Sequence, residues 1–261
     1  MMIYITPCQV TTQLASLFDP HAPASLRCFS VLAGPDTGRI LTGDPNRPIW
    51  AAVWEAGDGT LYFGGAPDES IVGQVVATLR HDGDVLVGFW DGDPLANLLP
   101  PDPEYLGSVL EFLDRPDDGA GLEAFLGRLP EGHTIRYGDR ALLERCLWYD
   151  DTVRRHGSAE AFLEKGRVVC LVHGDDVLCE AYAGPVVMGV RELGVITHEL
   201  HRGRGFATIT CAHLIQACER AGERTYWNCA TTNVASTAVA RKLGYQTEKE
   251  YQLRAWFKSE A

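Results

Sequence analysis

The chain has 261 residues, of which 46% are hydrophobic, and its formal net charge at pH 7 is −12. This composition can fill a sizeable core, which excludes disordered, collagen-like and coiled-coil chains, and the acidic balance excludes a basic nucleic-acid footprint over the whole chain. Residues 1–130 carry 6 basic and 18 acidic side chains, whereas residues 131–261 carry 17 of each, so the acidic excess lies in the first half.

The first half has a pattern of short apolar segments that predicts a mixed α/β domain. We predict strands over residues 49–55, 60–64 and 84–90, helices over 68–79 and 103–113, and a turn at 57–59. Asp68 stands where an N-cap residue would begin the helix over 68–79.

A stretch rich in Pro, Gly and Asp interrupts this pattern at residues 114–121, and a second turn follows at 129–132. Because the charge balance changes at the same place, we expect a domain boundary near residue 130. The predicted organisation is an acidic α/β domain over residues 1–130 and a second domain over residues 131–261.

The second half continues with helices and strands in alternation. We predict helices over residues 140–156, 158–164, 205–221 and 233–243, and strands over 168–173, 177–183, 186–197, 225–229 and 245–257. This order predicts a mixed sheet flanked by helices, which is an α/β fold class. The strand, turn and helix of residues 61–79 recur at 195–221, so the first half is either an unrelated domain or a degenerate copy of the second.

The cysteines and the N-terminus indicate the compartment. The eight cysteines are scattered without a CxxC pair, residues 1–18 lack the Lys or Arg that begins a signal peptide, and no run approaches the ~18 apolar residues of a membrane span. We therefore expect a reduced cytoplasmic protein with no membrane partner and no nucleic-acid partner. A homodimer is one alternative for its oligomeric state.

The segment Arg202-Gly203-Arg204-Gly205-Phe206-Ala207 lies between a predicted strand and a predicted helix. Glycines allow tight turning and close approach of a ligand, and the N–H groups at a helix N-terminus attract an anion. This pattern indicates a pyrophosphate site, with an exposed basic turn as the alternative. It lacks the Gly-Lys-Ser/Thr ending of a Walker loop, and Thr208 stands where a dinucleotide fingerprint needs glycine.

The surrounding motifs resemble those of the GCN5-related N-acetyltransferases, the GNAT family. Glu192-Leu-Gly-Val-Ile-Thr197 followed by Arg202-Gly-Arg-Gly-Phe-Ala-Thr208 resembles the fourth strand and the R/Q-x-x-G-x-G/A loop of that family. Tyr226-Trp-Asn-Cys229, Asn233-x-x-Ser236 and Ala240-Arg-Lys-Leu-Gly-Tyr245 resemble the fifth strand, the fourth helix and the following strand. The set is similar to that of zwittermicin A resistance-type acetyltransferases. The resemblance covers residues 140–258 and implies a GNAT fold with a splayed sheet there, after a smaller α/β domain.

The resemblance implies that acetyl-CoA is the co-substrate and assigns roles to the residues around the loop. The pyrophosphate would be held by the backbone N–H groups of Gly203, Arg204, Gly205, Phe206, Ala207 and Thr208, while Arg202 orders the loop. The pantetheine arm would pair with the backbone of Val195, Ile196 and Thr197 and meet Asn233 and Ser236. One N–H of that strand would polarise the thioester carbonyl.

Acyl transfer to an amine by direct attack needs a base for the ammonium proton and an acid for the departing thiolate. Glu192 is the first candidate for the base, Glu180 the second, and a water-mediated route is compatible with either. Many relatives carry a tyrosine as the acid seven residues after the asparagine, but this chain has Ala240 there. Ser236, Tyr245 and water are the candidate replacements.

No metal is expected, because His198-Glu-Leu-His201 departs from the HExxH spacing of zinc enzymes. We expect Cys229 to be a buried structural thiol rather than an acyl-carrying nucleophile.

The resemblance predicts an N-acetyltransferase that acts on a small-molecule amine, with an antibiotic or a biosynthetic intermediate as candidate acceptors. Acidic residues of the first half would attract a cationic acceptor: Asp91, Asp93, Asp102 and Glu104. Two alternatives stay open. One is a non-catalytic acyl-CoA-binding module, and the other is an acyltransferase whose donor is a longer acyl-CoA, a carrier protein or an aminoacyl-tRNA.

Overall fold

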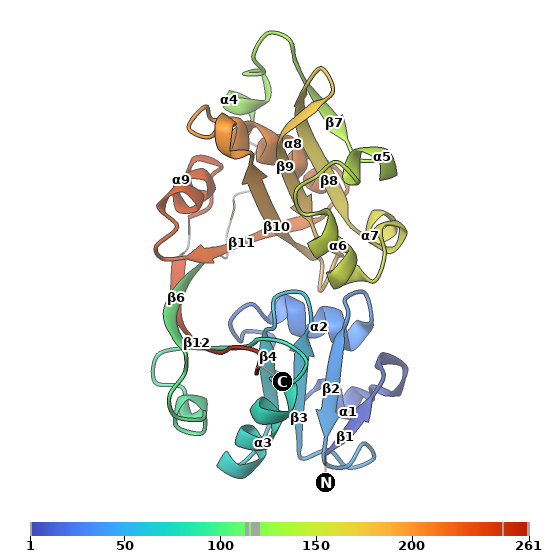
Figure 1. The fold of residues 1–261 in the computed structure, drawn as a ribbon, viewed down its shortest axis with the longest axis vertical. Helices are drawn as coiled ribbons and strands as arrows, with labels where there is room; N and C mark the ends of the chain where they lie inside the picture. Colours follow the sequence, from blue (N-terminus) through green and yellow to red (C-terminus); the bar gives the residue numbers. More distant parts are fainter. Residues whose placement is uncertain (1, 113–114, 116–120, 247, 260–261) are drawn as a thin grey trace. The chain divides into compact units, whose positions relative to one another are not determined.

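The computed structural model describes residues 2–112, 115, 121–246 and 248–259 (Figure 1). The chain folds into two compact units. The first unit is Met1–Val109 with Glu250–Ala261, and the second unit is Leu110–Lys249. Each unit contains strands flanked by helices, so the predicted α/β class is confirmed. The domain boundary near residue 130 stays a prediction.

The first unit is built on an antiparallel sheet with the order β1-β2-β3-β4. Its strands are β1 (Ile3–Ile5), β2 (Gly38–Thr42), β3 (Trp50–Glu55), β4 (Leu61–Gly65) and β5 (Val85–Phe89). Its helices are α1 (Thr12–Ala15), α2 (Ser25–Ala33), α3 (Glu69–Leu79) and the 3₁₀ turns η1 (Pro7–Gln9) and η2 (Pro94–Asn97). Strand β5 pairs antiparallel with residues 252–256 of the last strand, β12 (Glu248–Trp256).

The second unit contains the strand order β6-β11-β10-β9-β8-β7. Its strands are β6 (Tyr105–Phe112), which begins in the first unit, β7 (His133–Tyr137), β8 (Arg167–His173), β9 (Asp176–Ala183), β10 (Val190–Thr197) and β11 (Arg224–Ala230). Its helices are α4 (Glu123–Leu126), α5 (Arg140–Leu143), α6 (Tyr149–His156), α7 (Ala159–Lys165), α8 (Phe206–Arg220), α9 (Val234–Lys242) and the 3₁₀ turn η3 (Glu199–His201).

Strands β8 and β9 are buried on both faces, which explains their nearly continuous apolar sequences. Because side chains alternate along a strand, Ala181 packs into the core cluster that contains Leu214 of α8. The next residue, Tyr182, packs on the opposite side with Phe162 of α7. The sheet of the second unit therefore lies between α8 and the helices α5 and α7.

The two units share one order of elements. In each, three antiparallel strands are followed by a helix and then by a strand that is parallel to the third: β2-β3-β4-α3-β5 and β8-β9-β10-α8-β11. The strand, turn and helix recurrence noted in the sequence corresponds to β4-α3 and β10-α8.

The helix predicted over residues 103–113 is wrong, because residues 105–112 form strand β6 and residue 113 lies outside the described residues. The apolar residues of this segment are compatible with a helix or with a strand. Val109 and Glu111, however, are two residues apart and both buried, as expected for one face of a strand. The Tyr226 hydroxyl on neighbouring β11 donates to the Glu111 carboxylate. Tertiary pairing therefore decides the local structure.

The helix predicted over residues 140–156 is divided into α5 and α6. Between them, the backbone N–H groups of Leu147 and Trp148 each donate to the Glu180 carboxylate at 2.9 Å. These donors therefore bind a buried carboxylate on β9 and not the carbonyls of a continuous helix. Most of the predicted linker at residues 114–121 lies outside the described residues.

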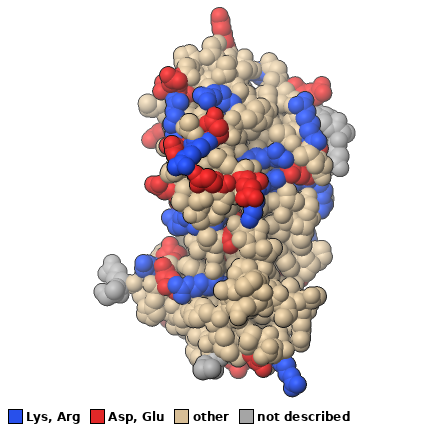
Figure 2. Space-filling view, turned by 90° about the vertical axis from the view of Figure 1, so that its right-hand side faces the viewer, with Lys and Arg blue, Asp and Glu red and all other residues tan. Residues whose placement is uncertain are grey.

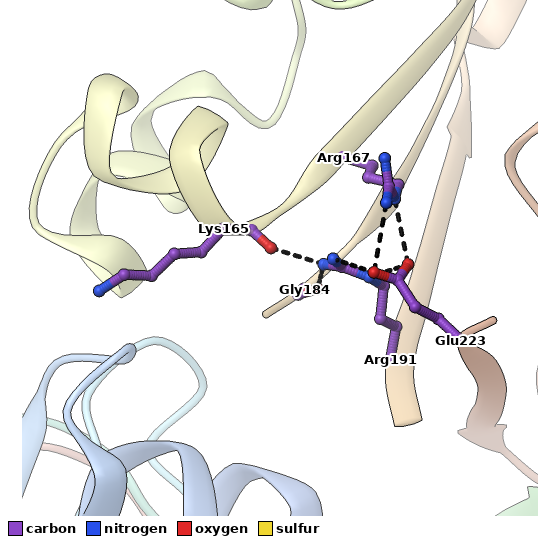
Figure 3. Close-up of polar contacts among 5 residues, drawn as sticks. All are labelled: Lys165, Arg167, Gly184, Arg191 and Glu223. Carbon is purple, nitrogen blue, oxygen red and sulfur yellow. Dashed lines mark hydrogen bonds and ion pairs between the residues drawn. The ribbon is translucent and has the colours of Figure 1, made fainter. Parts of the chain in front are cut away.

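A buried arginine joins the elements around the start of β10 (Figure 3). Arg191 is 5% exposed, and its guanidinium donates to both carboxylate oxygens of Glu223, at 2.6 and 2.8 Å. The same group donates at 2.6 Å to the carbonyls of Lys165 and Gly184. Arg167 adds a second bidentate pair to Glu223 at 3.2 Å. We call Arg191, Glu223 and Arg167 the arginine clamp.

The arginine clamp makes stability pH-dependent. The hydrogen bonds from Arg191 lower the pKa of Glu223 from its ordinary 4.5 to about 2. A carboxyl whose pKa is lower in the folded state stabilises the protein above its unfolded pKa. That stabilisation is lost as the pH falls through the folded value, so the sensitive range is about pH 4.5 to 2.

Glu223→Gln leaves the Arg191 charge buried without a counter-ion, so we expect a loss of about 3 kcal/mol in the free energy of unfolding at pH 7. Urea unfolding of both proteins measures this difference. We expect it to be constant between pH 7 and 6 and to shrink below about pH 4.5. A difference that is absent at pH 7, or that does not change down to pH 3.5, would contradict the role of the charge.

Candidate functional site

Strands β10 and β11 separate after a short parallel pairing. Val190, Arg191 and Glu192 pair with residues 224–226 of β11. From Leu193 to Thr197, β10 continues in register with β9 only, within the described part of the chain. One edge of β10 therefore leaves β11 and presents backbone groups to the space between the two strands. An extended ligand can pair with such an edge.

The loop between β10 and α8 exposes backbone at its two glycines. Gly203 and Gly205 have φ values of 77° and 80°, the left-handed region that favours glycine. A Cβ atom at either position would have no described atom within 4 Å, so both open to free space. The two glycines thus make the loop both tightly turned and accessible.

The N-terminus of α8 has no side-chain cap. Gly205 is its N-cap residue. The first backbone hydrogen bond of the helix runs from the Ile209 N–H to the Gly205 carbonyl at 3.2 Å. The N–H groups of Phe206, Ala207 and Thr208 precede that bond, and the helix dipole makes this end attractive to an anion. The geometry suits a phosphate or pyrophosphate group.

One hydrogen bond joins the loop to the strand edge. The Arg202 Nε donates to the carbonyl of Thr197 at 3.2 Å, so the end of β10 and the glycine loop are brought together. Arg204 is exposed on the same loop. The predicted residues Val195, Ile196 and Thr197 are half-buried on β10, next to this loop in the chain.

Asn233 and Ser236 lie at the start of α9 and share one hydrogen bond. The Asn233 side chain caps the helix by accepting from the Ser236 N–H at 3.0 Å. The indole N–H of Trp227 on β11 donates to the Ser236 hydroxyl at 3.0 Å. Because an indole N–H only donates, the hydroxyl is the acceptor there and keeps its own proton for another partner.

Glu192 lies at the point where β10 and β11 begin to separate. Its carboxylate accepts a hydrogen bond from the side-chain amide of Asn228 at 2.9 Å. Sequence reasoning assigned no role to Asn228, which belongs to the quoted Tyr226–Cys229 motif. Glu192 is in register with Tyr226. Asn228 follows two residues later on β11, and only knowledge of this parallel register would have identified the pair.

Glu180, the second candidate base, is fully buried on β9. Besides the N–H groups of Leu147 and Trp148, it accepts from the Tyr182 hydroxyl at 3.3 Å, and the His198 Nε2 lies 3.8 Å from its Oε2. Burial, followed by the charge of Glu180, raises the pKa of Tyr182. Both carboxylate oxygens are engaged with backbone donors.

Trp148 is a further residue that sequence reasoning missed. A Cβ atom at Gly194 would lie 2.9 Å from its ring, so the indole packs directly over the backbone of β10. The ring also lies 5.6 Å from that of Tyr182. Only the absence of a side chain at Gly194 permits this packing.

Tyr245 is buried in the core of the second unit, whereas Ser236 lies in the first turn of α9. Its hydroxyl donates to Thr225 at 2.6 Å, and burial raises the pKa of the phenol. Ala240 is completely buried in the same core cluster. Cys229 is also buried, with its sulfur 3.4 Å from the hydroxyl of Thr237.

The surface charge, the groups that could bind a metal ion and the apolar helices of the described residues also bear on the function. The face in Figure 2 carries basic and acidic side chains close to one another, not one large patch of a single sign. Across the described ranges, no group of three His, Cys, Asp or Glu side chains is placed to hold a metal ion. None of the helices that the structure describes is long and apolar enough to cross a bilayer.

Comparisons with known proteins agree with this geometry. A crystal structure of a GCN5-related N-acetyltransferase-like protein from Streptococcus suis 89/1591 superposes with a TM-score of 0.74 at 24% identity, covering 97% of this chain and 100% of that one. A tandem GNAT protein from the clavulanic acid biosynthesis pathway superposes with a TM-score of 0.58 at 14% identity over 100% of both chains. These likenesses show the fold.

A sequence relative covers part of the chain. An uncharacterized N-acetyltransferase, YdfB of Bacillus subtilis (strain 168), is 27% identical over 128 residues. The match spans 48% of this chain and about half, 49%, of that relative. The profile of the GNAT acetyltransferase family matches residues 25–253. Because that match includes most of the sequence, the chain belongs to the GNAT acetyltransferase family.

Proposed function

We propose that this protein transfers an acetyl group from acetyl-CoA to the amine of a small molecule by direct attack. The observation that carries the proposal is the parting of β10 from β11 beside a glycine loop and an uncapped helix N-terminus. An extended ligand with a pyrophosphate at one end fits this combination, because the strand edge offers backbone pairing and the loop offers N–H donors.

The residues around the loop fit coenzyme A chemically. The open space at Gly203 and Gly205 leaves room for phosphate oxygens beside the backbone, and the Arg202 bond to Thr197 keeps the loop at the strand end. We assign the pyrophosphate to the N–H groups of residues 203–208 and the pantetheine arm to residues 195–197 with Asn233 and Ser236. When bound, the co-substrate supplies an activated thioester carbonyl, which a β10 N–H would polarise.

We assign Glu192 as the base that accepts the ammonium proton of the acceptor. Its half-buried position where β10 and β11 part supports this choice, and the Asn228 amide orients the carboxylate by donating to one of its oxygens. Only a neutral amine attacks a carbonyl, so proton removal must precede or accompany attack.

We assign Ser236 as the proton donor to the departing thiolate. The hydrogen bond from Trp227 fixes its oxygen and leaves its hydroxyl proton free to donate. Tyr245 is the weaker candidate, because its hydroxyl is buried and already donates to Thr225. A thiol is a good leaving group, so a weak donor such as serine suffices.

We assign Glu180 as a positioning residue and not as the base. Its oxygens hold the backbone of Leu147 and Trp148, and Trp148 packs over Gly194 on β10. Glu180 thereby fixes the segment that lies against the strand edge. Replacement of this carboxylate would therefore weaken the binding of the acceptor more than it slows proton transfer.

Finer aspects of the proposal rest on the sequence. The likeness to zwittermicin A resistance-type enzymes favours an antibiotic or a biosynthetic intermediate as the acceptor. The domain boundary near residue 130, the cytoplasmic location and the homodimer stay predictions.

A non-catalytic acyl-CoA-binding module is the second candidate, favoured by alanine at position 240. Release of free coenzyme A thiol with a panel of cationic primary amines, and acetyl-CoA as sole donor, decides between these functions.

Gly203→Ala tests the pyrophosphate site. The added Cβ enters the space assigned to phosphate oxygens, so we expect coenzyme A to bind at least about tenfold more weakly in isothermal titration. Gly174→Ala is the matched control, because Gly174 also has positive φ, 57°, and open surroundings, but lies in the β8–β9 turn. Equal weakening in both variants, or no binding by the folded wild-type protein, would contradict the site.

Glu192→Gln tests the base. The amide keeps the shape and loses the proton acceptor, so we expect kcat to fall by roughly 10²-fold or more while the KM for acetyl-CoA changes little. The same change at the exposed Glu164 serves as the control and should leave kcat unchanged. A Glu192→Gln enzyme with wild-type kcat would remove Glu192 from the mechanism.

Glu180→Gln tests positioning. An amide presents its NH₂ group to one of two backbone donors, so we expect a loss of about 2 kcal/mol in unfolding free energy, measured with urea. We also expect the KM for the acceptor to rise more than kcat falls. A loss confined to kcat, with stability and KM unchanged, would instead identify Glu180 as the base.

A further inference from the structure

The first unit contains a cavity of about 360 Å³ beside β4 and the end of β5. All of its lining residues lie between Phe18 and Leu98, within the first unit. Strands β4 and β5 start side by side at the parallel bridge between Thr60 and Leu86. The cavity lies further along, between residues of β4 and Gly88 and Trp90. This volume falls in the range of pockets that hold small organic molecules.

The charges of the cavity disfavour an anionic ligand. Among the described residues, its lining includes two carboxylates, Asp19 and Asp93, and no lysine or arginine. Helix α3, which follows β4, begins with its own carboxylates: Asp68 accepts from the Ile71 N–H at 2.8 Å, and Glu69 lies in the first turn. These carboxylates therefore balance the positive end of the α3 helix dipole, whereas the N-terminus of α8 has no such carboxylate.

The walls of the cavity are aromatic. Phe18, Tyr62, Phe63 and Trp90 all contribute to the lining. The Trp90 indole N–H donates to the His21 carbonyl at 3.1 Å, and its ring meets that of Tyr251 edge-on at 5.9 Å. A ring fixed in this way can offer its face to a cation, which the aromatic quadrupole attracts.

The two carboxylates are oriented by the backbone. Oδ1 of Asp19 accepts from the His21 N–H and Oδ1 of Asp93 from the Leu95 N–H, each at 2.8 Å. Within the described residues, the second oxygen of each carboxylate has no hydrogen-bond partner. Both aspartates thus retain acceptor capacity at the cavity.

A buried thiol supplies a third polar group. Cys28 lines the cavity, is 2% exposed and has no hydrogen-bond partner in the part of the chain that the structure describes. Burial raises the pKa of this thiol, so it stays neutral. The cavity therefore combines aromatic faces, two negative charges and an unpartnered buried S–H.

We propose that this cavity is a second ligand site, which binds a small organic ammonium ion with an apolar body. The carboxylates balance the ammonium charge, and the aromatic side chains cover the apolar part. This site differs from the one assigned to coenzyme A, because all of its groups belong to the first unit and none is part of the β10–α8 loop region. One of its carboxylates, Asp93, is among the residues expected from the sequence to attract a cationic acceptor.

Benzyltrimethylammonium is the probe for this site, since it carries no N–H and cannot be acetylated. We expect the full-length protein to bind it with a Kd of about 0.1–1 mM by isothermal titration, and to bind the similar-sized anion 3-phenylpropanoate at least about tenfold more weakly. Failure of the proposed acetyl transfer would not affect this result, and a failure here would leave the coenzyme A site untouched.

The double variant Asp19→Asn/Asp93→Asn removes both charges and keeps an oxygen acceptor at each position. We expect benzyltrimethylammonium to bind at least about tenfold more weakly, with unchanged coenzyme A binding as the folding control. Asp91→Asn, an exposed aspartate outside the lining, is the matched control and should bind as the wild type does. Equal binding of cation and anion, or full binding by the double variant, would overturn the proposal.

Discussion

The site geometry depends on the arginine clamp at the start of β10. Arg191 binds Glu223 and two backbone carbonyls, so it holds the beginnings of β10 and β11 at a fixed separation. The parallel pairing covers only Val190 to Glu192, directly around the clamp. With one end fixed by buried charge, the strands can part at the other end without loosening the sheet. The separation of β10 from β11 therefore begins at a point that the buried ion pair of the arginine clamp holds in place.

The two units use the same strand and helix order with opposite electrostatics. In the second unit, the helix after the third strand begins at Gly205, and no carboxylate lies in its first turn. In the first unit, the equivalent helix begins at Asp68 and carries Glu69 in its first turn. One helix N-terminus therefore attracts an anion, while the other neutralises its own dipole. This difference follows from a few residues and not from the backbone arrangement.

Local signals in the sequence predict part of the second unit. The hairpin of β8 and β9, helix α8 and the glycine loop follow from apolar runs, 3.6-residue spacing and Gly-rich turns, which act over short distances. The predicted elements do not include strands β1, β2 and β7 or helices α1, α2 and α4. The helix prediction over residues 103–113 fails because the pairing of β6 with β11 is a tertiary property, which local sequence does not contain. The Glu192–Asn228 pair depends on strand register, which one sequence does not contain.

The family resemblance implies a tyrosine at position 240, where this chain has a buried alanine. Ala240 is completely buried in the core cluster that also contains Trp227 and Leu243, so a tyrosine at this position would require the surrounding core to repack. Helix α9 therefore lies close to its neighbours at Ala240, one turn beyond Ser236. The same packing brings the Trp227 indole to the serine hydroxyl. Ala240 and Ser236 thus both belong to the packing of α9 in the second unit: the first is buried in its core cluster, and the second accepts a hydrogen bond from Trp227 on β11.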